Sequence, residues 1–297
     1  MTDQYTLRNP VTMYRDIIPT AQYQEGSGLD RDLDNRADLG EDSYRGSGRL
    51  AGRKALITGG DSGIGAATAI AYAREGADVA LSYLPEEQAD AERIAGLIRD
   101  AGRTALLLPG DLTDREYCEG LVRDAFEGLG GLDILVSNGG KQQYCTRVEN
   151  LPSEQFEETY RTNVFALFWL TRAAVEFLPA GSSIIASSSI QAYKPSAHLL
   201  DYASTKSAIN AYCKGLAEQL APRGIRVNVV APGPVWTPLQ TAGGQPTEDL
   251  PDFGDDVALG RPGQPAELAP AYVFLASAES SFVIGETLHV NGGMPTP

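Results

Sequence analysis

Short runs of β-branched and aliphatic residues alternate with longer alanine-rich segments from Lys54 onward. In the longer segments the apolar residues recur at helical spacing, which predicts helices between strands. Strands are expected at 55–58, 79–83, 105–108, 134–137, 183–187, 226–230 and 287–290. Helices are expected at 64–75, 86–101, 114–128, 153–177, 202–221 and 265–277. The strands are nearly continuous apolar runs, as in parallel strands covered by helices on both faces. The pattern predicts an α/β doubly wound sheet of about seven parallel strands, with ligands beyond their carboxyl ends.

Charge and hydropathy exclude several classes of partner. The chain has 297 residues and a formal net charge of −15, with its lysines and arginines scattered along it. This acid excess repels nucleic acids and anionic membranes, so we expect neither as a partner. The longest apolar run, 164–170, is far shorter than the ~20 residues that span a bilayer. Asp3 and Arg8 stand where a secretory signal would need apolar residues, so we expect a cytoplasmic protein.

Cysteine and histidine usage gives no sign of a metal site. Cys118, Cys145 and Cys213 are odd in number and form no C-x-x-C pair, which argues against a disulfide framework or a zinc site. His198 and His289 are too few and too far apart for a metal centre. We expect buried, reduced thiols and no metal.

Residues 1–48 differ from the rest of the chain. They are rich in Asp, Gly, Tyr and Arg, have no sustained apolar period, and end in Gly46-Ser47-Gly48. Apolar residues such as Ile17 and Tyr23 are enough to dock this N-terminal extension on a surface or a neighbouring subunit, and disorder is the equal alternative. Residues 49–297 are predicted to form a single domain.

A glycine-rich turn follows the first expected strand. Thr58–Gly65 reads T-G-G-D-S-G-I-G, and a helix is expected to begin there. Glycines permit positive φ and let backbone N–H groups approach a pyrophosphate at the positive end of the helix dipole. No Gly-Lys-Ser/Thr follows, which excludes a P-loop. The turn predicts a phosphate cradle.

Tyr202 and Lys206 stand four residues apart in an expected helix, so their side chains share one face. The reference pKa of tyrosine is ~10, and each unit of lowering needs about 1.4 kcal/mol of stabilisation of the phenolate. The Lys206 ammonium is expected to provide it and to make Tyr202 a general acid/base near neutral pH.

These motifs, in this order, resemble the short-chain dehydrogenase/reductase family over residues 52–293. The resemblance rests on T-G-x-x-x-G-I-G, on Y-x-x-x-K about 140 residues later, on Asn138-Gly139-Gly140, on Pro232-Gly233 and on the ending G-E-T-L-H-V-N-G-G. The extension, 59–62 and 189–193 look most like a bacterial subgroup related to general stress proteins. The resemblance implies a Rossmann-type fold and an NAD(P)-dependent oxidoreductase.

The resemblance implies roles for particular positions. Thirteen residues before the tyrosine stands Ser189, whose hydroxyl would orient the substrate oxygen toward Tyr202. Asn163 would hold a water that links Lys206 to solvent, and Lys206 would also bind the nicotinamide ribose. The implied cofactor contacts are Gly59, Asp61, Ser62, Gly63, Ile64, Gly65, Tyr83, Asp111, Leu112, Asn138, Gly139, Gly140, Tyr202, Lys206, Pro232, Gly233, Val235 and Thr237.

Cofactor choice and substrate are less clearly indicated. The second strand ends in Ser82-Tyr83-Leu84, with neither the acid of NAD enzymes nor the base of NADP enzymes, so we expect either cofactor with a slight lean to NAD. Residues 234–263 are expected to form a substrate lid. Besides Ser189, the candidate substrate contacts are Gln191, Tyr193 and Trp236.

The predicted reaction is hydride transfer between nicotinamide C4 and an alcohol, aldehyde or ketone, with Tyr202 as general acid/base. Family members are commonly tetramers, so we expect a homo-oligomer, by likeness a tetramer. Related epimerases and dehydratases use T-G-x-x-G-x-x-G, but position 62 is serine. The remaining alternative is a nucleotide-binding stress-related sensor or scaffold with incidental turnover.

Overall fold

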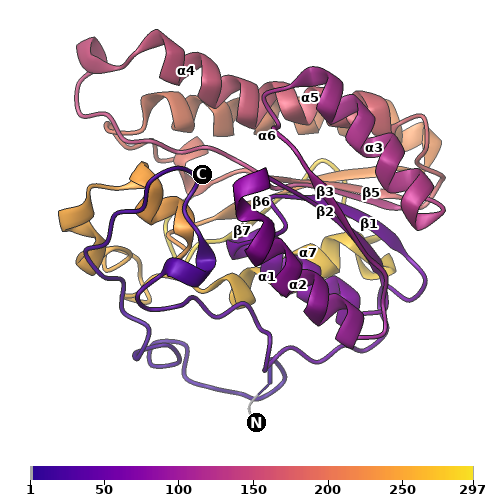
Figure 1. Cartoon of the computed structure of the whole chain (residues 1–297), viewed down its shortest axis with the longest axis horizontal. Helices are drawn as coiled ribbons and strands as arrows, with labels where there is room; N and C mark the ends of the chain where they lie inside the picture. The colour runs from indigo at the N-terminus through magenta and orange to yellow at the C-terminus, as the bar shows by residue number, and fades with distance from the viewer. Residues whose placement is uncertain (1–2, 297) are drawn as a thin grey trace.

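The computed structural model describes residues 3–296, and its centre is a seven-stranded parallel sheet (Figure 1). Its strands lie in the order β3-β2-β1-β4-β5-β6-β7. Strands are added toward one edge from β1 to β3 and toward the other edge from β4 to β7, so the strand order reverses between β1 and β4. The bounds are β1 (Lys54–Thr58), β2 (Asp78–Tyr83), β3 (Ala105–Pro109), β4 (Ile134–Ser137), β5 (Ser183–Ser187), β6 (Arg226–Pro232) and β7 (Thr287–Val290). The predicted fold class is confirmed, and every strand begins and ends within two residues of its expected range.

Helices cover both faces of the sheet (Figure 1). One layer contains α1 (Gly63–Arg74), α2 (Gln88–Asp100) and α7 (Pro265–Ala276), and the other contains α3 (Arg115–Leu129), α4 (Ser153–Tyr160), α5 (Ala166–Ala174) and α6 (Leu200–Leu220). A separate apolar core lies on each side of the sheet because strand residues such as Leu56 and Ile57 point to opposite faces. No helix within residues 3–296 combines the length and the apolarity of a membrane span.

The helix predicted over 153–177 is wrong as a single element. A π-helical turn, Arg161–Phe165, separates α4 from α5. Inside this turn Asn163 donates from Nδ2 to the Lys141 carbonyl at 2.9 Å and accepts from the Lys141 N–H at 2.8 Å. These long-range bonds hold the side chain on the loop after β4, and π turns of this kind often mark functional positions.

The N-terminal extension packs on its own chain. The Glu75 carboxylate, just past α1, accepts hydrogen bonds from the Tyr44 hydroxyl (2.8 Å), the Ser47 N–H (2.8 Å) and the Arg49 guanidinium (2.7 Å). Further along the extension, Leu33 and Ala37 form a small apolar cluster with Trp236 and Leu250. The extension therefore contacts both the end of α1 and the segment 234–263, and it runs along one side of the molecule (Figure 1).

Candidate active site

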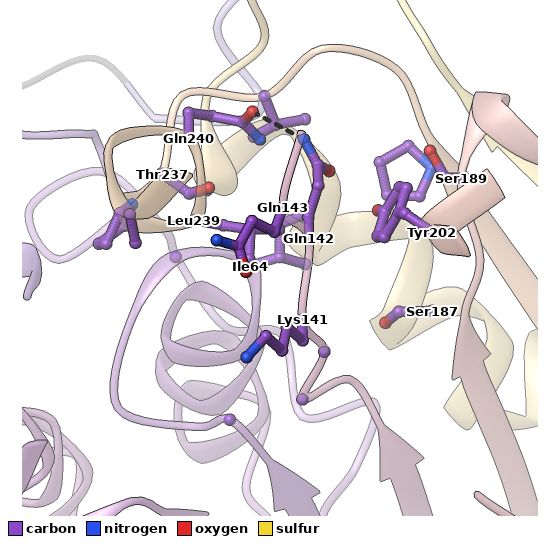
Figure 2. A pocket seen from close by; sticks show the side chains of 18 of the residues that line it. Ile64, Lys141, Gln142, Gln143, Ser187, Ser189, Tyr202, Thr237, Leu239 and Gln240 are labelled. Carbon is purple, nitrogen blue, oxygen red and sulfur yellow. Dashed lines mark hydrogen bonds between the residues drawn. The ribbon is translucent and has the colours of Figure 1, made fainter. Parts of the chain in front are cut away.

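A cleft of about 1140 Å³ opens at the carboxyl ends of the central strands. It is lined by the glycine-rich turn after β1 and by the loops that follow β2, β4, β5 and β6. In Figure 2, Ser189 and Tyr202 lie on one wall, and Thr237, Leu239 and Gln240 lie across from them. The site is where a doubly wound sheet is expected to bind its ligand, beside the reversal of strand order.

The glycine-rich turn is fixed against the loop after β4. Gly59 has φ +60°, and a Cβ there would lie 2.9 Å from the Cα of Gly139. The Thr58 hydroxyl accepts from the N–H groups of Asn138 and Gly139, both at 3.0 Å. A larger residue at position 59 would push the two loops apart.

The start of α1 gives the cleft the features of a dinucleotide site. The first N–H groups of an α-helix lack helical partners, and α1 begins at Gly63 on the cleft wall. Asp111 and Leu112 line the cleft after β3, and Pro232 and Thr237 line it after β6. A glycine-built helix start between these two groups fits the pyrophosphate of a nicotinamide dinucleotide, with adenosine and nicotinamide on either side.

Ser189 and Tyr202 come together at the catalytic end of the cleft. Tyr202 lies near the start of α6 and Ser189 lies just beyond β5, and the Ser189 hydroxyl is close enough to Tyr202 to lower its pKa. The two preceding serines point elsewhere: the Ser188 hydroxyl donates to the Lys206 carbonyl at 3.1 Å, and Ser187 bonds Asn138 and Tyr272. Of the three adjacent serines, Ser189 has the geometry expected of a substrate-orienting hydroxyl.

Lys206 is buried beneath Tyr202. Its Nζ donates to the Ser187 carbonyl at 2.9 Å and lies 5.2 Å from the centre of the Tyr202 ring. Burial lowers the pKa of Lys206 to about 8. Burial also raises the pKa of Tyr202 to about 12, and the neighbouring Ser189 hydroxyl opposes this effect. At this position desolvation of the phenolate has the larger effect on the pKa of Tyr202.

Most residues expected to contact cofactor line the cleft. The predicted contacts that line it are Gly59, Asp61, Ser62, Gly63, Ile64, Tyr83, Asp111, Leu112, Asn138, Gly139, Gly140, Pro232, Gly233, Val235 and Thr237, with Tyr202 and Lys206 at the catalytic end. Gly65 stands behind them, where a Cβ would overlap the Gly59 carbonyl oxygen at 1.8 Å. Asn163 also lies behind the wall, beside Gly140, and hydrogen-bonds the backbone of Lys141, which lines the cleft.

Two of the expected substrate contacts lie outside the cleft. Trp236 is fully buried, and its indole N–H donates to the Asn35 carbonyl at 2.7 Å. The extension fills the space around this indole, so the interpretation of Trp236 as a substrate contact is wrong for this structure. Tyr193 packs its ring against His289 at 4.7 Å, whereas Gln191 does line the cleft.

Sequence reasoning missed several lining residues. Lys141, Gln142 and Gln143 directly follow the Asn138–Gly140 motif and point into the cleft (Figure 2). Their position after a strand end was a signal that could have identified them. Tyr23 and Ser27 of the extension also line the cleft, and no local pattern pointed to them. Within residues 3–296, no group of three His, Cys, Asp or Glu side chains is arranged to hold a metal ion.

Comparison with known proteins agrees with this geometry. A family model described as enoyl-(acyl carrier protein) reductase, adh_short_C2, matches residues 59–295. The uncharacterized oxidoreductase YhxD of Bacillus subtilis is 55% identical over 98% of both chains. General stress protein 39 of the same organism is 44% identical over 94% of this chain and 97% of its own. NADPH-dependent aldehyde reductase 1 of Arabidopsis thaliana is 42% identical over 90% of this chain and 94% of its own.

Solved structures give the same picture. A short-chain dehydrogenase from Burkholderia cenocepacia, crystallised with NADP, superposes with a TM-score of 0.77 at 33% identity, covering 82% of this chain and 98% of that one. The motifs, the sheet order, the family model and the relatives therefore agree. The chain is an oxidoreductase that belongs to the short-chain dehydrogenase/reductase family.

Proposed function

We propose that this protein transfers a hydride between nicotinamide C4 and a small alcohol, aldehyde or ketone, with Tyr202 as general acid/base. The observation that carries the proposal is that Ser189 and Tyr202, with Lys206 beneath the tyrosine ring, line the same cleft as the glycine-rich turn. When bound there, a nicotinamide dinucleotide supplies or accepts the hydride. The chain provides binding, orientation and the proton.

The ionisation of these side chains favours proton donation. With a pKa of about 12, the Tyr202 phenol is protonated at neutral pH and can give its proton to a carbonyl oxygen that becomes a hydroxyl. Ser189, whose hydroxyl lies beside Tyr202, is placed to donate to the same oxygen as negative charge develops on it. Lys206 contributes positive charge below its pKa of about 8. In this protonation state Tyr202 can act as the general acid of carbonyl reduction.

The charges around the adenosine end support a preference for NAD. Near the end of β2, the cleft is lined by Asp61, Glu86 and Glu87. The basic side chains lining the cleft in the described part of the chain are three lysines, 141, 194 and 206, which belong to the loops and helix around the catalytic residues. A 2′-phosphate at the adenosine end would face carboxyl groups without a cation. NADP in the Burkholderia enzyme shows that the fold itself accepts the phosphate.

The experiment that tests this function is oxidation of NADH and NADPH, in parallel, against a panel of aldehydes, ketones and sugars. We expect turnover, faster with NADH at limiting cofactor concentration. Tight nucleotide binding without turnover on any substrate would instead favour a sensor or scaffold. A hundredfold tighter binding of NADPH than of NADH would overturn the preference for NAD.

An exposed aromatic face supports the proposal of a homo-oligomer. Phe156 lies on α4, Phe165 on the turn after it and Phe168 on α5, and each is at least 40% exposed. Exposed side chains of this size on successive elements mark a protein contact, and we assign it to a second copy of the chain.

Replacing Phe168 by glutamate should therefore lower the molar mass in solution, because two buried carboxylates would face each other across a symmetric contact. Light scattering after size-exclusion chromatography measures the change. Tyr5→Glu is the control, since Tyr5 is an exposed aromatic of the extension. A Phe168→Glu protein with the mass of the original assembly would exclude this face as the interface.

The thiols are consistent with a reducing, cytoplasmic compartment. All three cysteines are unpaired. Burial raises the pKa of both Cys118 and Cys213 to about 12, so these thiols stay protonated and unreactive. Cell fractionation with an antibody to the full chain tests this location, and recovery with an exported fraction would contradict it.

A further inference from the structure

A loop of the N-terminal extension reaches the cofactor cleft. Tyr23, Gly26 and Ser27 line the same cleft as Tyr202 and the glycine-rich turn. The loop is closed by its own side chain: Gln24 accepts from the Leu29 N–H at 2.6 Å and donates to the Leu29 carbonyl at 3.3 Å. The extension therefore presents a shaped loop to the cleft, and we call residues 23–28 the extension loop.

The extension loop is anchored on two sides. On one side, the Gln24 N–H donates to the Thr241 carbonyl at 2.9 Å, within the segment 234–263. Gly28, with φ +76°, approaches the same segment so closely that a Cβ would lie 2.9 Å from the Pro238 carbonyl oxygen. On the other side, Ser27 lies beside Glu87, which immediately precedes α2, and its hydroxyl opposes the burial that raises the pKa of that carboxyl group. The loop thus spans the mouth of the cleft at its adenosine end.

The chain continues from this loop to a buried ion pair. Just beyond it, the Asp30 N–H donates to Asp90 on α2 at 2.9 Å, and the Asp30 carboxylate pairs with Arg93 at 2.9 Å. Both contacts join the extension to the helix that begins at the adenosine end. The position of Ser27 beside Glu87 is therefore set by neighbouring bonds rather than by that one contact.

Two carboxyl groups with spare acceptor capacity lie at this end. Asp61, on the glycine-rich turn, is 1% exposed, and its Oδ2 has no hydrogen-bond partner. Glu87 accepts from the Leu84 N–H at 2.7 Å, just beyond β2. Burial raises the pKa of both groups, and the negative charge of Glu87 adds to the effect on Asp61. An unpartnered buried acceptor on a cleft wall is stabilised by a ligand that donates a hydrogen bond.

We propose that Asp61, Glu87 and the extension loop together form the subsite for the adenosine ribose, accepting its hydroxyl groups and excluding a 2′-phosphate. This inference rests on the proposed nicotinamide cofactor. A ribose diol offers two donors to carboxylate oxygens, whereas a phosphate offers acceptors and negative charge to groups already short of donors. The selectivity comes from residues outside β2, whose own end, Ser82-Tyr83, has no charge.

The test measures the binding of NADH and of NADPH to the full chain, without any substrate, through the fluorescence of each nucleotide. We expect wild-type protein to prefer NADH, and Asp61→Asn/Glu87→Gln to reduce that preference by at least about tenfold, mainly through tighter NADPH binding. The control is Glu92→Gln/Asp100→Asn, which removes the same formal charge from α2 outside the cleft and should leave the ratio within about threefold. An unchanged ratio in the Asp61/Glu87 variant would overturn the inference.

Ser27→Arg tests the contribution of the extension separately. A guanidinium beside Glu87 would supply a cation for the 2′-phosphate, so NADPH binding should tighten at least about tenfold. Wild-type NADPH affinity in this variant would remove the extension from the subsite. Glu87→Gln alone is a nearly isosteric second variant in case the double substitution unfolds the chain. If wild-type protein binds neither nucleotide, the proposed function fails; if it binds NADH and the ratios do not move, only this inference fails.

Discussion

Tyr202→Phe is expected to lower kcat for carbonyl reduction by roughly 10²–10⁴-fold, the range that positioned general acids contribute. The substitution keeps the aromatic ring that packs over Lys206 and removes the hydroxyl that lies beside Ser189. We therefore expect the fold and the affinity for NADH to stay close to those of the wild type. Steady-state kinetics together with NADH fluorescence titration separate the two effects.

Tyr212→Phe is the matched control. Tyr212 lies on the same helix, α6, and its hydroxyl contacts Thr171 at 2.6 Å, outside the cleft. It should keep kcat within about threefold of the wild type, as expected of a residue remote from the reacting atoms. Less than a tenfold loss in Tyr202→Phe would show that another group moves the proton.

A double substitution gives a sharper reading of the same site. If Ser189 and Tyr202 act on one substrate oxygen, Ser189→Ala/Tyr202→Phe should be little slower than the worse single variant, because residues that work as a unit are strongly non-additive. Simple multiplication of the two losses would indicate independent roles. That result would contradict the shared oxygen, whatever the size of each single effect.

Glu75→Gln is expected to destabilise the folded chain by about 3 kcal/mol, the cost of removing one partner from a buried ion pair. The carboxylate is fully buried and faces donors from Tyr44, Ser47 and Arg49. A glutamine would leave the Arg49 guanidinium, 24% exposed, without its buried charged partner and with only the exposed Glu279 carboxylate at 3.6 Å. Urea unfolding at pH 7 measures the difference in unfolding free energy.

The effect has a defined pH dependence. Burial alone would raise the pKa of Glu75, but the bonds from Arg49, Ser47 and Tyr44 outweigh it and lower the pKa to about 2. A carboxyl whose pKa is lower in the folded state than in the unfolded state stabilises the fold. The full stabilisation is present above the unfolded-state pKa, and it is lost as the pH falls through the folded-state pKa. The difference between wild type and Glu75→Gln should therefore shrink to roughly half by pH 3.

Glu279→Gln is the control for this pair. Glu279 contacts the same Arg49 at 3.6 Å, but its side chain is 56% exposed. Exposed ion pairs contribute about 0–1 kcal/mol, so this variant should unfold almost as the wild type does. Equal destabilisation by the two variants would mean that the contribution of Glu75 to the unfolding free energy does not depend on its burial.

The fold could be predicted from local pattern because each strand and helix carries its own periodicity. β1 to β7 are short runs that are apolar on both faces, and the helices between them repeat their apolar residues at helical spacing. The break between α4 and α5 could not be predicted in this way. It lies where Asn163 bonds the backbone of Lys141, 22 residues earlier in the chain.

The candidate site divides in the same manner. The turn Thr58–Gly65 and the pair Tyr202 and Lys206 are local motifs, so the sequence alone was sufficient to propose a dinucleotide cleft with an acid/base tyrosine. The pKa of that tyrosine could not be predicted from the sequence, because a pKa depends on burial, and burial depends on every element that packs around the group.

What the sequence determined by itself is therefore the order of strands and helices along the chain and the residue types at the strand ends. Only the tertiary structure decided the position of the extension, which buries Trp236 and brings Ser27 to Glu87. Ser27 and Glu87 are far apart in the chain, and no periodicity links them. Their contact depends on the packing of residues 3–48 against a finished sheet and its helices, which is a property of the whole fold.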